Sequence, residues 1–244
     1  MIGLLALAAC APAPVADGAG DSDEPPGDTA DPLAERYRCG PYAPQASATL
    51  PFGEASARAV YRTSDQEVAT SETMGAEVYE GWDTWVYETT TVGADASGTE
   101  VSLAVRSHYL CDVEGLKHHD ITTTASHLDT AGESVIDSES RWAMHDHPLV
   151  YPIDMGLGSA WTYATRATES RDGADLEWTL EKRREIVAVE TTEVTAGSFE
   201  ALVLDEVDHS EPEARPANTL YLAEWVGLVK SSHLELVSFA RLDL

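Results

Sequence analysis

The stretch VSLAVRSHYLC, residues 101–111, alternates apolar and polar side chains along most of its length. Most odd-numbered positions carry apolar side chains, whereas Ser102, Arg106 and His108 occupy even-numbered positions. Successive side chains of a β-strand point to opposite faces of a sheet, so a period of two indicates a strand buried on one face. The stretch therefore predicts a strand with one face toward a core.

The same alternation recurs between about residue 37 and residue 244. The segments that show it and are rich in Val, Thr, Tyr and Trp are 84–92, 159–169, 176–189, 199–207, 220–225 and 234–242. Short turn signals separate many of the neighbours, at 94–98, 114–115, 131–132, 171–173 and 196–197. Strands joined by such short turns pair as antiparallel hairpins. We predict an all-β domain, residues 37–244, in which one large curved antiparallel sheet forms a barrel, a half-barrel or a two-sheet sandwich.

Bulky residues on the apolar faces of these segments predict a filled interior. They are Val101, Leu103, Val105, Trp161, Tyr163, Trp178, Leu180, Val203 and Val207. Side chains fill a barrel of about eight strands, and recognition would then fall to the loops 148–158 and 210–218. We expect the first loop to cross between two halves of the sheet. The alternative is a curved sheet whose concave face, with Trp161, Tyr163 and Trp178, takes an apolar ligand.

The first ten residues, MIGLLALAAC, are apolar and small up to Cys10. An apolar segment of this length is typical of a secretory signal. The tetrad Leu7–Cys10 resembles the lipobox of bacterial lipoproteins, which implies a diacylated Cys10 and, with Ala11 next, an outer-membrane location. Residues 11–35 carry seven acids and neither Lys nor Arg, so we predict that residues 11–36 form a disordered tether.

The chain carries 43 acidic against 15 basic residues, a formal net charge of −28. A field of this sign disfavours nucleic acid and anionic membrane surfaces and suits cationic partners. Of the three Cys, lipidation of Cys10 leaves Cys39 and Cys111. An exported protein meets oxidising conditions, so we predict a Cys39–Cys111 disulfide.

Two short groups of residues raise the question of a metal. On a strand, His145 and His147 would share a face, and so would His118 and Asp120. Zinc sites need three or four converging ligands, and each group offers two. We predict that these residues are polar strand-end surface without a metal, and the alternative is a metal-dependent hydrolase built on the His residues.

Three motifs carry a resemblance to secreted, β-rich bacterial lipoproteins that have no assigned function. They are PLVYP at 148–152 followed by GSAWTY at 158–163, TAGSFEAL at 195–202, and YLAEWVGLVK at 221–230. The third motif of that group usually has Gly where this chain has Trp225. The resemblance implies an antiparallel β architecture, distantly similar to the half-barrels of lipoprotein carriers such as LolA and LolB.

Together these observations predict a lipid-anchored cell-envelope protein, monomeric and without cofactor or catalytic activity, that acts as a binding or structural module. Its partners would be the membrane, through the lipid, and an envelope protein or apolar small molecule. The alternatives are a carrier that encloses a lipid or other apolar ligand, and the His-based enzyme.

Overall fold

The computed structural model describes residues 55–64, 68–74, 77–95, 97–224 and 226–241, which contain fourteen strands and no helix. The first seven strands are β1 (Ala55–Thr63), β2 (Val68–Met74), β3 (Glu77–Tyr79), β4 (Trp82–Ala94), β5 (Glu100–Asp112), β6 (Gly115–Leu128) and β7 (Ser134–Met144). The other seven are β8 (Leu149–Pro152), β9 (Ala160–Arg171), β10 (Ala174–Val194), β11 (Gly197–Asp208), β12 (Asn218–Ala223), β13 (Gly227–Lys230) and β14 (Leu234–Arg241). The predicted lipidation site Cys10, the tether 11–36, Cys39 and Trp225 lie outside the described residues. No helix in the described part of the chain could span a membrane.

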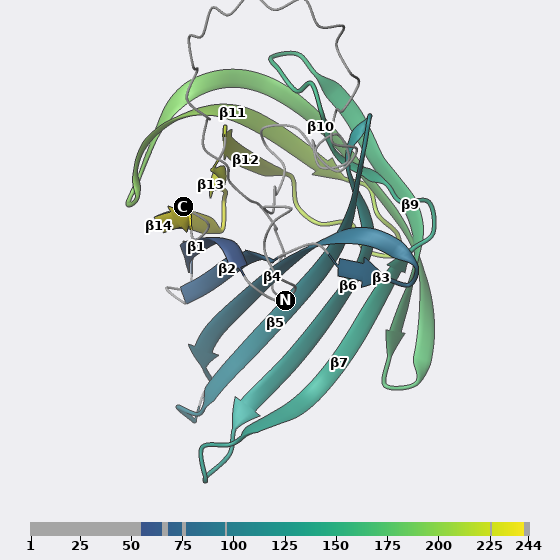
Figure 1. Ribbon diagram of the computed structural model, residues 1–244, viewed down its shortest axis with the longest axis vertical. Helices are drawn as coiled ribbons and strands as arrows, with labels where there is room; N and C mark the ends of the chain where they lie inside the picture. Colours follow the sequence, from purple (N-terminus) through teal and green to yellow (C-terminus); the bar gives the residue numbers. More distant parts are fainter. Residues whose placement is uncertain (1–54, 65–67, 75–76, 96, 225, 242–244) are drawn as a thin grey trace, which may run out of the picture.

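The strands form a closed antiparallel barrel (Figure 1). Around the wall the order is β2, β1, β14, β13, β12, β11, β10, β9, β7, β6, β5 and β4, and β2 pairs with β4 from Val68–Val92 to Thr73–Tyr87 to close the ring. Twelve strands thus make the wall, while β3 pairs with β4 and β8 with β6. The predicted all-β antiparallel fold is confirmed, and of the three predicted architectures it is the barrel.

The segment between β7 and β9 does not cross between two sheets, which corrects the expectation for residues 148–158. It links two strands that are neighbours in the wall, and β8 lies back along the start of β6. Gly115 permits this approach, because its φ is +136° and a Cβ there would overlap the carbonyl oxygen of Tyr151. The other predicted loop is exposed from residue 211 to residue 217.

The inside of the barrel has two regions. In the packed region the side chains are almost completely buried; its large members are Tyr61, Trp85, Tyr87, Tyr109, Tyr151, Ile186, Leu204, Leu220, Leu222, Leu228 and Leu236. The hairpin region lies toward the turns at 95–99, 129–133 and 172–173 (lower part of Figure 1). Large apolar side chains on the same face stay partly exposed there. These side chains are Leu103, Ile121, Trp142, Trp178 and Leu180.

This difference corrects the prediction of an interior filled throughout. Barrel diameter grows with strand number, and about eight strands give an interior that side chains fill. The wall has twelve strands, and bulky inward side chains are fully buried in the packed region but only partly buried in the hairpin region. Val207, predicted to face the core, is 43% exposed, because it alternates with the inward-facing Glu206 and Asp208.

Candidate functional site

An ionic network on the inner face of the barrel joins β10 to β11. Arg184 is directly opposite Glu206 in the register of the two strands. Its Nε donates to Glu206 Oε2 at 2.7 Å, and Lys182 Nζ donates to Glu206 Oε1 at 2.9 Å. Both side chains of the Arg184–Glu206 pair are more than nine-tenths buried. Two cations therefore share one carboxylate on the inner face.

The same guanidinium ties the network to the core aromatics. Arg184 donates to the carbonyl oxygen of Val150 at 2.8 Å, and its Cζ lies 5.2 Å from the Tyr163 ring centroid and 5.8 Å from that of Tyr151. Burial alone would raise the pKa of Glu206, but Arg184 and Lys182 lower it to about 2. Burial also lowers the pKa of Lys182, despite Glu206. The network stays ionised and fixed because each charge has a partner.

His118 extends this polar group around the wall. Its ring stacks on Tyr109 with centroids 4.6 Å apart, and its Nδ1 lies 3.1 Å from the hydroxyl of Tyr163. Burial, followed by the charges of Arg184 and Lys182, lowers the pKa of His118 to about 3. The imidazole is therefore neutral at physiological pH, and its buried Nε2 has no hydrogen-bond partner.

The predicted apolar-ligand residues all lie on the inner face. Trp161 and Tyr163 of β9 are directly opposite Arg184 and Lys182 of β10, and Trp178 continues the same face of β10. Tyr163 belongs to the packed region, with 5% exposure, whereas Trp161 and Trp178 keep partial exposure. The inner face thus offers indole surface beside a fixed ionic group, which can orient a ligand with an apolar body and a polar end.

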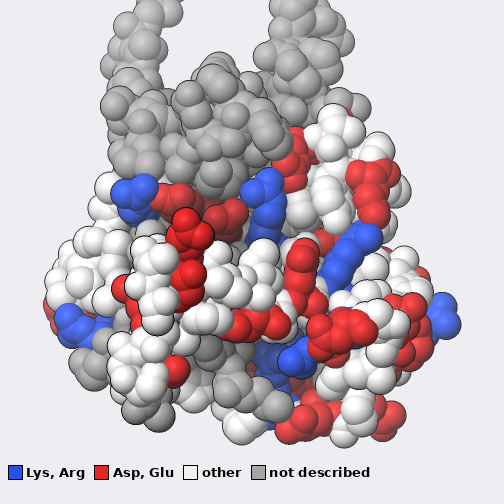
Figure 2. All heavy atoms as spheres, turned by 90° about the horizontal axis from the view of Figure 1, so that it is seen from below, with Lys and Arg blue, Asp and Glu red and all other residues white. Residues whose placement is uncertain are grey.

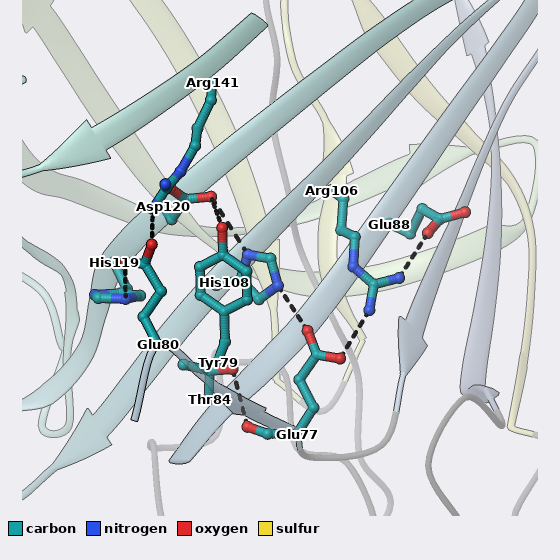
Figure 3. Close-up of polar contacts among 10 residues, drawn as sticks. All are labelled: Glu77, Tyr79, Glu80, Thr84, Glu88, Arg106, His108, His119, Asp120 and Arg141. Carbon is teal, nitrogen blue, oxygen red and sulfur yellow. Dashed lines mark hydrogen bonds and ion pairs between the residues drawn. The ribbon is translucent and has the colours of Figure 1, made fainter. Parts of the chain in front are cut away.

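A second polar cluster lies on the opposite face of the wall, under β3 (Figure 3). His108 Nε2 lies 2.7 Å from Glu77 Oε1, its Nδ1 lies 3.5 Å from Asp120 Oδ1, and Tyr79 stacks on its ring at 3.8 Å. Burial alone would raise the pKa of Asp120, yet His108 and Arg141 lower it. His108 is 2% exposed beneath β3, and the contacts of Glu77 and Tyr79 with His108 and Asp120 hold β3 against β5 and β6.

The expectation that His118 and Asp120 share a face is wrong. The ladder between β5 and β6 pairs Tyr109 with His118 but His108 with Asp120, so a bulge at His119 shifts the register. The extra residue turns His118 inward and Asp120 outward. Strand alternation alone could not show this.

The other two metal candidates also separate. His145 is exposed and its Nε2 lies 2.8 Å from the hydroxyl of Thr168, whereas His147 Nδ1 lies 3.2 Å from Nδ1 of His119. Across the described ranges, no group of three or more His, Cys, Asp or Glu residues is arranged to hold a metal ion.

Cys111 takes part in a disulfide. Cys39 lies outside the described residues, so the Cys39–Cys111 pairing stays a prediction.

The residues predicted from the sequence do not include the ionic network, although the sequence carries a signal for it. Leu180, Lys182, Arg184 and Ile186 alternate with exposed residues, so two cations interrupt an otherwise apolar face of β10. A charged residue at such a position needs a buried partner. Comparison with protein-family models, curated proteins and solved structures finds no match to this chain.

Proposed function

We propose that this protein is a lipid-anchored cell-envelope binding protein whose barrel holds an apolar small molecule in the hairpin region. One observation carries the proposal: on the inner face of the long strands, next to the part of the barrel where the ring closes, Trp142, Trp178 and Leu180 face inward yet remain partly exposed. Large apolar side chains that face a core are normally buried. Incomplete burial at this place supports a site that a ligand completes.

The packed region supports the same proposal from the other side. Its aromatic and aliphatic side chains, such as Trp85 and Leu220, close that part of the interior. A ligand therefore enters from the hairpin region and stops at the ionic network of Lys182, Arg184 and Glu206. Lys182 keeps 21% side-chain exposure, so it lies at the boundary between the two regions.

The anchoring half of the proposal rests on the lipobox-like Leu7–Cys10. A lipid at Cys10 would hold the barrel near a membrane, where apolar molecules are available. The wild type is expected to partition into detergent and to carry the additional mass of acyl chains, whereas Cys10→Ala is expected to be soluble. Detergent phase separation and intact-mass spectrometry measure the two properties. A native wild-type product whose Cys10 carries no acyl chain would exclude anchoring but leave the barrel's binding untouched.

Ligand binding is tested with decanol as a neutral apolar probe, by calorimetry and by displacement of a fluorescent apolar dye. We expect Leu103→Gln, which places an amide on the partly exposed inner face, to weaken decanol binding roughly five- to tenfold, the cost of losing part of an apolar contact. Val207→Gln is the matched control, because Val207 is exposed outside the wall. Absence of decanol binding to the wild type, or equal loss in both variants, would overturn the proposal.

A further inference from the structure

We propose that Trp142, Glu169 and Trp178 form a binding site for an organic ammonium group. The inference rests on the proposed function and names the chemical class of its ligand: an apolar molecule with a cationic nitrogen. The three residues come from β7, β9 and β10, three neighbouring strands of the wall.

The register places the three side chains together on the inner face. Trp142 is directly opposite Glu169, and Trp178 is directly opposite Ala167, two residues before Glu169 on the same face. The two indole rings lie 5.1 Å apart at an interplanar angle of 43°. Glu169 Oε2 accepts a hydrogen bond from Trp178 Nε1 at 3.1 Å. Two tilted indole rings in contact with each other thus lie beside one carboxylate, and Trp178 turns its N–H edge toward it.

Within the part of the chain that the structure describes, no cation pairs with the Glu169 carboxylate. Glu169 is only 8% exposed, and its one hydrogen bond within the described residues comes from an indole N–H. It takes no part in the ion pairs of the described residues, and Arg171, next along this face of β9, contacts Asp172 instead. A carboxylate buried to this degree is normally paired with a cation or a metal. The missing partner is what a ligand would supply.

The rings select the kind of cation. An ammonium group is attracted to the face of an indole within about 6 Å of its centroid, and Trp is the best of the aromatic residues for this contact. A strongly hydrated inorganic ion would lose bound water here, and one carboxylate offers too few oxygen ligands to replace it. The partly exposed Ile121 lies directly opposite Trp142 and extends the apolar lining, so it can contact the alkyl part of the molecule.

The charge of the whole protein favours the same class of ligand. The formal net charge is −28, and acidic side chains spread over the face seen from the lower end of Figure 1, with fewer Lys and Arg among them (Figure 2). Such a field raises the local concentration of cations and repels anions. It does not provide specificity, which the Trp142–Glu169–Trp178 cluster would add.

The test compares decyltrimethylammonium, below its micelle concentration, with decanol on the full-length protein by calorimetry. We expect the wild type to bind the cation at least tenfold more tightly than the alcohol. Glu169→Gln, which can still accept the Trp178 hydrogen bond, should reduce this preference to less than threefold. Trp142→Leu should weaken binding of the cation by about tenfold. Binding should also quench less indole fluorescence in this variant than in the wild type.

Glu185→Gln is the control, because it removes the same charge from the exposed outer side of β10. It should keep the wild-type preference. Equal affinity of the wild type for the two probes, or an equal effect of Glu185→Gln and Glu169→Gln, would overturn the ammonium site while the apolar-ligand function stands. If the wild type binds decyltrimethylammonium but not decanol, and Glu169→Gln abolishes that binding, the ammonium site is supported and the proposal of a general apolar-ligand function is refuted.

Discussion

The packed region and the hairpin region are built from the same wall but differ in what their inward side chains do. In the packed region Leu220 and Leu236 have no exposed surface, whereas in the hairpin region Leu103 and Trp178 face the same interior and remain partly exposed. Stability therefore resides mainly at one end. The other end keeps apolar surface available, at a cost in hydrophobic stabilisation.

Strand length explains the difference. The strands that flank the packed region, such as β2, β12 and β13, are at most seven residues long, whereas β4, β5, β6 and β10 have at least thirteen. The long strands extend past the short ones on their side of the barrel. Their inner faces there lack opposing strands to cover them, so their side chains keep contact with solvent.

The largest effect is expected from Glu206→Gln, in the ionic network of the interior. The substitution keeps the shape of the side chain but leaves Arg184 and Lys182 without a negative partner. Breaking a buried ion pair costs about 3 to 5 kcal/mol, and urea denaturation followed by circular dichroism measures it. Glu185→Gln should change stability by less than about 0.5 kcal/mol. A stability loss below about 1 kcal/mol in Glu206→Gln would contradict the account of the network.

A matched pair of leucines tests the comparison itself. Leu220→Ala removes a fully buried side chain and should lower the free energy of unfolding by about 2 to 5 kcal/mol. Leu103→Ala removes a side chain that is partly exposed and should cost less than about 1.5 kcal/mol. The cost is smaller because Leu103 buries less apolar surface on folding than a fully buried leucine does. Equal losses in urea midpoints would mean that the two regions are packed alike.

The smallest effect concerns pH. The pKa of His118 is about 3 in the folded protein and about 6.5 when unfolded. Below pH 6.5 the unfolded chain binds the proton first, so this group's contribution is fully present above pH 6.5 and is lost progressively toward pH 3. Between pH 7 and pH 5 the loss is about 2 kcal/mol. His118→Gln should flatten that slope in denaturation curves. An unchanged slope would show that His118 is not the group responsible.

Sequence alternation was enough to predict the strands that bury one apolar face. The segments at 84–92, 101–111, 159–169 and 199–207 correspond to β4, β5, β9 and β11, and the turn signals fall at the hairpins between them. Alternation did not reveal β6 or β7. In β6, for example, residues 122–127, TTTASH, are mostly polar on both faces. Periodicity is readable only where the two faces differ in polarity.

The candidate site depends on register, which the sequence does not display. Trp142 lies opposite Glu169 because of the register in which β7 pairs with β9. Arg184 lies opposite Glu206 because of the register in which β10 pairs with β11. A bulge at His119 reverses the direction of every side chain beyond it on that strand. One inserted residue therefore puts His118 and Asp120 on opposite faces of β6.

The pairing of β1 with β14 has a consequence for how this protein folds. Ala57 is the partner of Arg241, so the first and last described strands lie side by side. The ring cannot close until almost the whole barrel sequence has emerged, and contacts of such large separation in sequence form slowly. Until then β1 and β14 present unpaired edges on which other chains could add. The barrel should therefore complete its folding after synthesis rather than during it, and its open edges make it prone to aggregate until then.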